Sequence, residues 1–313
     1  MASQGLTSEQ LDEHINTDTF ASALNIASLH KSFGNVPILK NLNLSVPSGH
    51  VYGFLGRNGA GKSTTIRTIM GITQPDKGKV YVFGQDVSRS LLCRQQIGYV
   101  AQEQNFYGWM TAKRLGEFVA GFYPNWDAKT FQQLLGRLDV PFKQKVGTFS
   151  TGMKAKLALA LAVSHHPRML LLDEPTAGMD PFARREFIEI IRDEKITGGR
   201  TTIFSSHFIN EVEMVASRVG VIESGQMYFD GSLAELHEAV LCFVSPMCSG
   251  IEDQVALTFS DVEILKQYQR DNDYYVFVRA PELQSLDLPA STWKPQKLSL
   301  EDILFAMNGK SAL

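Results

Sequence analysis

The sequence predicts an α/β protein built on a largely parallel sheet covered by helices, with a small α+β unit after it. Two observations predict the sheet. Between Val51 and Glu223, short apolar runs alternate with stretches of helical periodicity. A glycine-rich turn also separates the first of these apolar runs from the helix that follows it. From about Leu236 this alternation gives way to a different pattern, which predicts a separate unit.

The composition is that of an ordinary globular protein. Of 313 residues, 44% are hydrophobic and 20% are charged, which excludes a disordered tail protein or a collagen-like fibre. The formal net charge is −3, from 30 basic and 33 acidic residues. No global basic field therefore argues for nucleic acid, and no nucleic-acid partner is expected.

No segment reaches the roughly 20 apolar residues that a membrane-spanning helix needs. The longest apolar run, Leu157 to Val163, is far shorter. Met1 to Thr19 is polar and lacks the apolar centre of a signal peptide. We therefore expect a soluble, cytoplasmic chain that needs another polypeptide in order to act at a membrane.

The first third of the chain is predicted to begin with a polar extension over residues 1–24. Leu24 to Leu29 and Leu42 to Val46 alternate apolar and polar residues, which predicts two strands with one buried face each. Val51 to Leu55 predicts a short buried strand, and Ser63 to Met70 predicts a helix. The glycine-rich turn thus stands between a strand and a helix, as a phosphate-binding loop requires.

The middle of the chain is predicted to be mostly helical from Phe106 to Ala162, because its apolar residues recur on one face of each helix. A second buried strand, Met169 to Leu172, follows. The remaining alternation is helix, strand, helix and strand, over Pro181 to Glu194, Thr201 to Ser205, Phe208 to Ala216 and Val219 to Glu223.

The closing unit is predicted to mix strands and helices. Val255 to Phe259 and Tyr274 to Arg279 predict strands, and Val262 to Gln269 predicts a helix between them. Leu298 to Met307 predicts a final helix.

The glycine-rich turn fits the pattern G-x-x-x-x-G-K-[ST] at every fixed position. Its glycines let backbone N–H groups turn inward toward phosphate oxygens, at the positive end of the following helix. Lys62 is expected to reach the β- and γ-phosphates, and Ser63 to offer its hydroxyl to Mg²⁺. The predicted nucleotide site consists of Gly56, Arg57, Asn58, Gly59, Ala60, Gly61, Lys62, Ser63 and Thr64.

The second buried strand ends in two carboxylates, Asp173 and Glu174. In a phosphate-loop protein this position places Asp173 near the hydrated Mg²⁺. Glu174, one residue further on, can face an attacking water as a general base or polarising group. The loop and the carboxylates together do not separate kinases, GTPases and transport ATPases.

A third stretch, Phe149 to Lys154, decides between these classes. Together with Gln102 and His207 it resembles the ATP-binding cassette (ABC) family of ATPases. In that family a short Leu-Ser-Gly-Gly-Gln signature opens a helix and presents its Ser and Gly to the γ-phosphate of the partner subunit. The matching residues here are Ser150 and Gly152, and the departures from the common form are Phe149, Thr151 and Met153.

The resemblance implies roles for residues outside the loop. Phe33 falls where the family places an aromatic ring that stacks on adenine, and a core phenylalanine is the alternative. Gln102 matches the Q-loop, whose amide senses Mg²⁺ and couples to the transmembrane subunit. Asp180 matches the D-loop at the dimer interface. His207 matches the switch histidine, which contacts the γ-phosphate and orients the water.

The resemblance covers about residues 25–235, and it implies a P-loop NTPase cassette that binds ATP and Mg²⁺. Such a cassette has a RecA-like core, an antiparallel β part and a helical subdomain, here at about 104–167. The predicted division is thus an N-terminal extension over 1–24, the cassette over 25–235 and a C-terminal accessory domain over 236–313.

The resemblance also implies partners. One chain carries one phosphate loop and one signature, so two cassettes are expected to meet head to tail as a homodimer around two ATP molecules. A separate transmembrane permease subunit is expected to hold them on the cytoplasmic face of the inner or plasma membrane. The signature and the stretch Leu298 to Leu304 resemble those of bacterial drug, peptide and antibiotic exporter ATPases. Phe106, Tyr107 and Trp109 are either core residues or exposed anchors for the permease.

Two other functions remain as alternatives. A soluble ABC ATPase acting on ribosomes or DNA usually carries two cassettes or a long coiled-coil insertion, and neither is visible here. A phosphate-loop kinase or GTPase would leave four matches as coincidences, namely Gln102, Ser150, Gly152 and His207.

Overall fold

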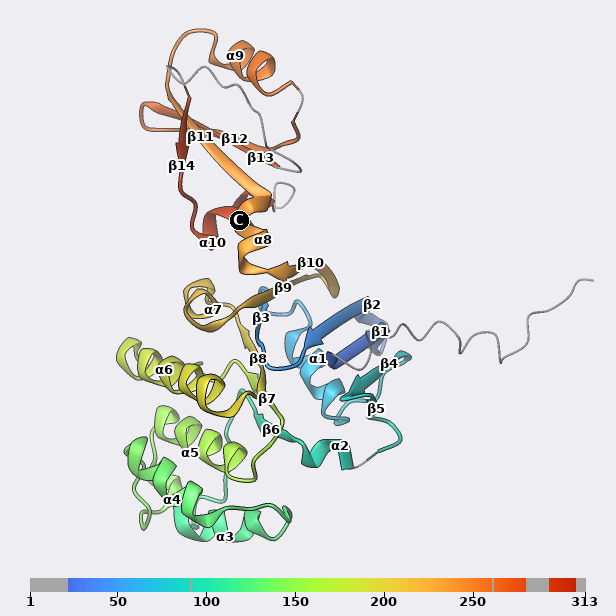
Figure 1. The fold of residues 1–313 in the computed structure, drawn as a ribbon, viewed down its shortest axis with the longest axis vertical. Helices are drawn as coiled ribbons and strands as arrows, with labels where there is room; N and C mark the ends of the chain where they lie inside the picture. Colours follow the sequence, from blue (N-terminus) through green and yellow to red (C-terminus); the bar gives the residue numbers. More distant parts are fainter. Residues whose placement is uncertain (1–21, 91, 261, 280–292, 308–313) are drawn as a thin grey trace, which may run out of the picture. The chain divides into compact units, whose positions relative to one another are not determined.

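The computed structural model describes residues 22–90, 92–260, 262–279 and 293–307 (Figure 1). They form two compact units. One comprises the chain up to His207 together with residues 215–230, and the other comprises residues 208–214 together with the chain from Gly231. Of the predicted N-terminal extension, residues 1–21 lie outside the described part of the chain, and residues 22–24 belong to the first strand.

An antiparallel sheet opens the first unit, in the order β2-β1-β4-β5. Both strands predicted in this region form, because Leu24 pairs with Val46 on one side and with Val82 on the other, all three buried. Each strand is longer than the alternating apolar run that predicts it. The strands are β1 (Ser22–Phe33), β2 (Val36–Pro47), β4 (Lys77–Val82) and β5 (Gln85–Asp86).

The second sheet of this unit has the order β10-β9-β3-β8-β7-β6, and its β9-β3-β8-β7-β6 portion is parallel. Every residue of β3, β7 and β8 is buried, as expected for parallel strands covered on both faces. The sheet contains β3 (Val51–Leu55), β6 (Ile97–Val100), β7 (Met169–Asp173), β8 (Thr201–Ser206), β9 (Arg218–Glu223) and β10 (Gln226–Ser232).

The register of the parallel strands brings three loops to one edge of the sheet. Leu55 pairs with Ser206, and Asp173 pairs with Ser205. The loop after β3, the turn after β7 and the segment after β8 therefore begin beside one another. The helix α1 (Lys62–Ile69) contacts β2 and β4 of one sheet and β7 of the other, so its apolar side chains join a core shared by both sheets.

The helical region of the first unit lies between β6 and β7 in the chain (Figure 1, green to yellow-green). The helices α3, α4 and α5 pack on one another, and α5 also packs on β6 and α6. Thr111, Asp127 and Ser150 cap α3, α4 and α5, each accepting a backbone N–H. This region contains α3 (Ala112–Ala120), α4 (Ala128–Arg137), the 3₁₀ turn η3 (Val146–Thr148) and α5 (Thr151–Val163), whereas α2 (Leu92–Gln95) precedes β6 and α6 (Pro181–Gly198) follows β7.

The second unit contains α7 and a four-stranded antiparallel sheet in the order β12-β13-β11-β14. The helix α9 packs on one face through a core that includes Phe243, Val276 and Trp293. The helix α10 contacts α8 and β12. The elements are α7 (Ile209–Val215), α8 (Leu233–Ala239), β11 (Val240–Pro246), α9 (Ile251–Thr258), β12 (Ile264–Arg270), β13 (Asp273–Arg279), β14 (Lys294–Gln296) and α10 (Leu300–Met307).

Two predictions for this unit are wrong, and the first concerns Val255 to Phe259. This stretch is apolar at every position except Thr258, but most of it lies in α9 instead of a strand. Ile251, Val255 and Phe259 recur every four residues, and all three are buried in the core. Leu257, which would share a face with Val255 and Phe259 in a strand, is 79% exposed. The helical period therefore prevails.

The second wrong prediction is the helix over Val262 to Gln269, most of which forms the strand β12. This strand pairs with β13 from Ile264 opposite Val278 to Arg270 opposite Asp273. The connection is a two-residue turn in which Asp271 has a φ of 55°, as a tight hairpin requires. Polar turn residues between two strand-forming runs are the signal that predicts this hairpin. The predicted strand over Tyr274 to Arg279 and the final helix are confirmed.

Across the described helices, none combines the length and the apolar character that crossing a lipid bilayer requires.

Candidate active site

The loop between β3 and α1 has a path that only glycine permits at two of its positions. A Cβ atom on Gly56 would lie 2.5 Å from the backbone oxygen of Ile222. Gly61 has a φ of 114°, and a Cβ atom there would lie 2.7 Å from Leu39 Cδ2. The loop is held by backbone hydrogen bonds from Ala60 N to Arg57 O and from Gly225 N to Ala60 O. Its tip, residues 57–59, is exposed.

Lys62 begins α1, and its ammonium group turns back under the loop. Nζ donates hydrogen bonds to Gly56 O at 2.7 Å and to Arg57 O at 3.2 Å. It also lies 3.0 Å from Glu174 Oε1. The residue is only 4% exposed, so its charge is compensated by the loop carbonyls and by one carboxylate.

Asp173 ends β7 with a fully buried carboxylate. Its Oδ1 accepts hydrogen bonds from Ser63 Oγ and from Ser205 Oγ, both at 3.0 Å. Its Oδ2 is buried and has no hydrogen-bond partner in the described part of the chain. Burial raises the pKa of Asp173, while the two serine hydroxyls act in the opposite direction. A buried carboxylate oxygen without a partner, beside a serine hydroxyl, fits a hard cation such as Mg²⁺.

Glu174 is the point where the predicted catalytic residues meet. Its carboxylate accepts a hydrogen bond from Gln102 Nε2 at 3.4 Å, and its Oε2 lies 3.1 Å from His207 Nδ1. The ion pair with Lys62 completes the group. Its φ of 42° is unusual for a residue with a side chain and costs about 1–3 kcal/mol. The backbone N–H of Glu174 donates to Ser205 Oγ at 2.9 Å, which helps to hold this conformation.

At one edge of the sheet, the segments that follow β3, β6, β7 and β8 thus bring together the ammonium group of a lysine, two carboxylates, an amide and an imidazole. These groups can bind phosphate, hold a divalent cation and accept a proton from water. The sequence predicted all of them, but it did not predict Ser205, which bridges Asp173 and the backbone of Glu174. The available signal was the pair of serines, Ser205 and Ser206, that ends a buried strand directly before the predicted switch histidine.

The remaining predicted residues do not join this cluster through hydrogen bonds. Ser150 Oγ accepts from Met153 N at 3.2 Å and caps α5. Asp180 Oδ1 accepts from the backbone N–H groups of Phe182 and Ala183, and the bond from Ala183 is the main cause of its lowered pKa. Each of these side chains therefore caps the helix that it precedes.

Phe33 ends β1 and is 54% exposed, so the alternative of a core phenylalanine is wrong. The ammonium group of Lys31 lies 5.5 Å from the centre of its ring. Thr64 is half-buried in the first turn of α1, and its carbonyl accepts a hydrogen bond from Thr68 Oγ1 at 2.8 Å.

Exposed aromatic rings gather beside the segment that follows Gln102. Tyr107 and Trp109 are 57% and 62% exposed, so they are not core residues, and Phe106 is half-buried. Tyr107 contacts Trp109 and Phe118, and Phe118 contacts Phe122, with ring centres 5.3–6.2 Å apart. We call Tyr107, Trp109, Phe118 and Phe122 the aromatic cluster.

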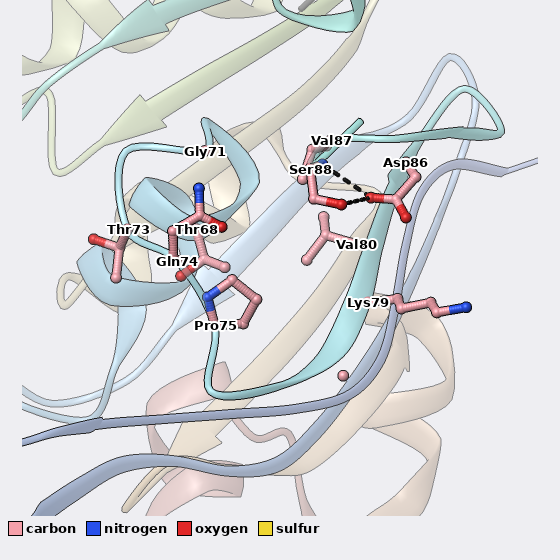
Figure 2. A pocket seen from close by; sticks show the side chains of 11 residues that line it. Thr68, Gly71, Thr73, Gln74, Pro75, Lys79, Val80, Asp86, Val87 and Ser88 are labelled. Atoms are coloured by element: carbon pink, nitrogen blue, oxygen red, sulfur yellow. Dashed lines mark hydrogen bonds between the residues drawn. The ribbon is translucent and has the colours of Figure 1, made fainter. Parts of the chain in front are cut away.

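A hollow lies at the opposite end of α1 from the phosphate loop, about 12 Å along the helix. Figure 2 shows Thr68, Lys79, Asp86 and Ser88 around it. Asp86 Oδ1 accepts from the backbone N–H and the hydroxyl of Ser88, at 2.9 and 2.6 Å. These polar groups are engaged with one another, and the hollow is not part of the cluster around Glu174.

Comparisons with known proteins agree with this geometry. Residues 39–177 match the sequence profile described as ABC transporter. The Nod factor export ATP-binding protein I of Bradyrhizobium diazoefficiens is 32% identical over 306 residues, 92% of this chain and 97% of that protein. The bacitracin transport ATP-binding protein BcrA of Bacillus licheniformis is 33% identical over 211 residues, 66% of this chain and 69% of that protein.

Among solved structures, a dimeric post-hydrolysis state of the ATP-binding cassette MJ0796, bound to ADP and Pi, has a TM-score of 0.61 and 22% identity. The structural match covers 67% of this chain and 98% of the MJ0796 chain. This likeness identifies the fold as that of an ABC cassette, and the relatives that span most of the chain identify its family. The chain belongs to the ATP-binding subunits of ABC transporters and is an ATPase of that family.

Proposed function

We propose that this chain powers an exporter: two copies close around two ATP molecules and drive a separate transmembrane permease. The observation that carries the catalytic part is the meeting of Lys62, Gln102 and His207 on the carboxylate of Glu174, beside Asp173. Each residue of this group is of a type that ATP hydrolysis needs.

In the proposed mechanism, Ser63, Asp173 and Gln102 would hold Mg²⁺, which would supply charge that stabilises the phosphate oxygens. Lys62 exchanges its contact with Glu174 for the β- and γ-phosphates, which frees the carboxylate. Glu174 then accepts a proton from the attacking water, oriented by His207. The water oxygen bonds to the γ-phosphorus while the bond to the β-phosphate oxygen breaks, and ADP leaves with that electron pair. Phe33, exposed at the end of β1, is proposed to stack on the adenine ring.

The second copy is proposed to complete each site. Ser150 and Gly152 lie at the start of α5, and the hydroxyl of Ser150 is occupied in capping that helix. Asp180 caps α6 in the same manner. Because these residues make no hydrogen bonds to the Glu174 cluster, we assign them to the nucleotide of the opposite copy, where two helix N-termini favour a phosphate.

The domain division proposed from the sequence is kept with one change, because β1 begins at Ser22: the cassette is placed over 22–235, with its helical subdomain at about 104–167, and the accessory domain over 236–313. The permease is proposed to contact the aromatic cluster, since exposed aromatic rings are favoured anchors at protein interfaces. The chain would then be peripheral on the cytoplasmic face of the membrane. Export is supported by the names of relatives, which include Nod factor export and bacitracin transport.

Co-purification tests this proposal. The tagged Glu174→Gln chain is isolated from native membranes solubilised with MgATP, beside a variant that adds Trp109→Ala and Tyr107→Ala. We expect a multispanning protein to co-purify in stoichiometric amount. It should be lost with the aromatic substitutions and kept with the control Leu257→Ala. Ribosomes, DNA or no partner, from a chain that binds ATP, would instead favour a soluble ABC ATPase.

A further inference from the structure

Two helices that begin at functional loops are joined by an ion pair inside the first unit. The helix α5 starts after Ser150, and α6 starts after Asp180. Lys156 Nζ of α5 lies 2.7 Å from Glu186 Oε2 of α6. The lysine side chain is only 12% exposed, whereas that of the glutamate is 43% exposed. An ammonium group with so little access to water depends on its carboxylate partner.

The pair lies at the same height in both helices. Lys156 is six positions beyond Ser150, and Glu186 is six positions beyond Asp180. With a rise of about 1.5 Å per residue, each charged residue lies roughly 9 Å along its helix from the capping residue. The ion pair therefore restrains movement of α5 along α6, and with it the relative position of the two helix N-termini.

The loops that carry these N-termini also touch. A Cβ atom on Gly178 would lie 3.4 Å from Thr151 Cγ2, and one on Gly152 would lie 3.9 Å from Met179 Cγ. Thr151 is one of the departures from the common signature, and its methyl group, which a glycine at this position lacks, lies beside Gly178. The charge of Lys156 makes a smaller contribution to the lowered pKa of Asp180, after the backbone N–H groups of Ala183, Phe182 and Asp180.

We propose that Lys156 is a positioning residue that acts through Glu186. The ion pair holds the N-terminus of α5, with the signature residues Ser150 and Gly152, at a fixed position relative to Asp180. Both segments can then contact the nucleotide of the second copy at the same time. This inference rests on the proposed assignment of Ser150, Gly152 and Asp180 to that nucleotide. The expected effect of Lys156 differs from that of the residues around Glu174, because Lys156 acts on the ATP-dependent dimerisation of two copies and not on the binding of ATP to one copy.

The test uses the full chain with Lys156→Met, with Glu186→Gln, and with the charge-reversed pair Lys156→Glu and Glu186→Lys. Binding of a fluorescent ATP analogue to the single copy is expected to stay within about twofold of the parent. ATP-dependent dimerisation, measured in the Glu174→Gln background, and kcat are each expected to fall by about tenfold in the single variants. The reversed pair is expected to recover most of this loss.

The control is Arg185→Met, which breaks the exposed Arg185–Glu189 pair within α6, where the side chains are 75% and 61% exposed. It should leave dimerisation and kcat unchanged. If Lys156→Met lowers the midpoint of thermal unfolding, Glu186→Gln gives the same test with less loss of buried charge.

Three outcomes would overturn the inference. Single variants that dimerise and hydrolyse ATP like the parent show that the pair positions nothing. A defect that the reversed pair does not repair shows that Lys156 does not act through Glu186. If the Glu174→Gln parent binds ATP but never dimerises, the proposed two-copy site is itself wrong, and the role of Lys156 falls with it.

Discussion

The ammonium group of Lys62 lies 3.0 Å from the carboxylate of Glu174, and the two side chains are only 3% and 7% exposed. The pair joins the residue proposed to bind phosphate with the residue proposed to activate water. Removing either side chain leaves the other charge buried with less compensation. The two substitutions are nevertheless expected to affect different steps, which makes the pair a sensitive place to test the mechanism.

Lys62→Ala is expected to weaken ATP binding by about 10- to 100-fold, because its buried ammonium group lies against the phosphate loop, 2.7 Å from Gly56 O. Isothermal titration with ATP measures this. Lys79→Ala, which removes an exposed lysine of β4, serves as the control and should bind ATP like the parent. Unchanged ATP affinity in Lys62→Ala would contradict the assignment of the loop.

Glu174→Gln is expected to bind ATP with nearly the parental affinity and to hydrolyse it at least about 100-fold more slowly, because the amide cannot take up the proton. Phosphate release under saturating MgATP measures the rate. The substitution keeps the size of the side chain, so thermal unfolding serves as a check on the fold. Turnover close to that of the parent would show that another group is the base.

Phe182→Ala is expected to weaken the ATP-bound dimer by about tenfold. Phe182 is 87% exposed and stands two residues beyond Asp180, the residue proposed for the dimer interface. A large aromatic ring so exposed is a candidate interface anchor. Sedimentation of the Glu174→Gln chain with ATP measures the effect. Leu257→Ala, at a 79% exposed position of α9, is the matched control, and an equal effect of both variants would speak against an interface at Phe182.

His165 is expected to make the chain less stable at acid pH. Its ring is 3% exposed and stacks on Tyr123, with 3.9 Å between ring centres. Burial, together with the charge of Arg200, lowers the pKa of His165 to about 4, from an ordinary value of 6.5. Between these values the unfolded chain binds a proton that the folded chain refuses, so stability is kept above pH 6.5 and falls as the pH drops toward 4.

This histidine should account for about 2 kcal/mol of the stability lost between pH 7.5 and pH 4.5. Urea unfolding of the parent and of His165→Phe at both pH values isolates its share, since the phenyl ring can keep the stacking on Tyr123 but does not titrate. Equal losses in the two proteins would show that folding does not lower the pKa of His165.

The sequence was most informative where spacing and periodicity carry the structure. The strand, loop and helix around Lys62 were predicted because their residues are consecutive, and the buried strands β3, β7 and β8 because they are short apolar runs. Within the second unit, α9 and β12 were each assigned the wrong type. Short apolar segments fit both periods: pairing with β13 decides for β12, and burial of Ile251, Val255 and Phe259 decides for α9.

Contacts between residues far apart in the chain could not be predicted from spacing. Ser205 is one of two consecutive serines at the end of β8, and nothing in the spacing shows that it supports both Asp173 and Glu174. The ion pair of Lys156 with Glu186 joins two helices whose relative height depends on packing. Strand β5 has only two residues, too few to show a period of any kind.

The mass in solution of the Glu174→Gln chain, measured with MgATP and with MgADP, tests the central claim most directly. The account predicts a dimer with ATP and a single copy with ADP, because Ser150 and Gly152 of one copy are proposed to bind the γ-phosphate held by the other. A chain that binds ATP tightly but remains a single copy with either nucleotide would contradict it.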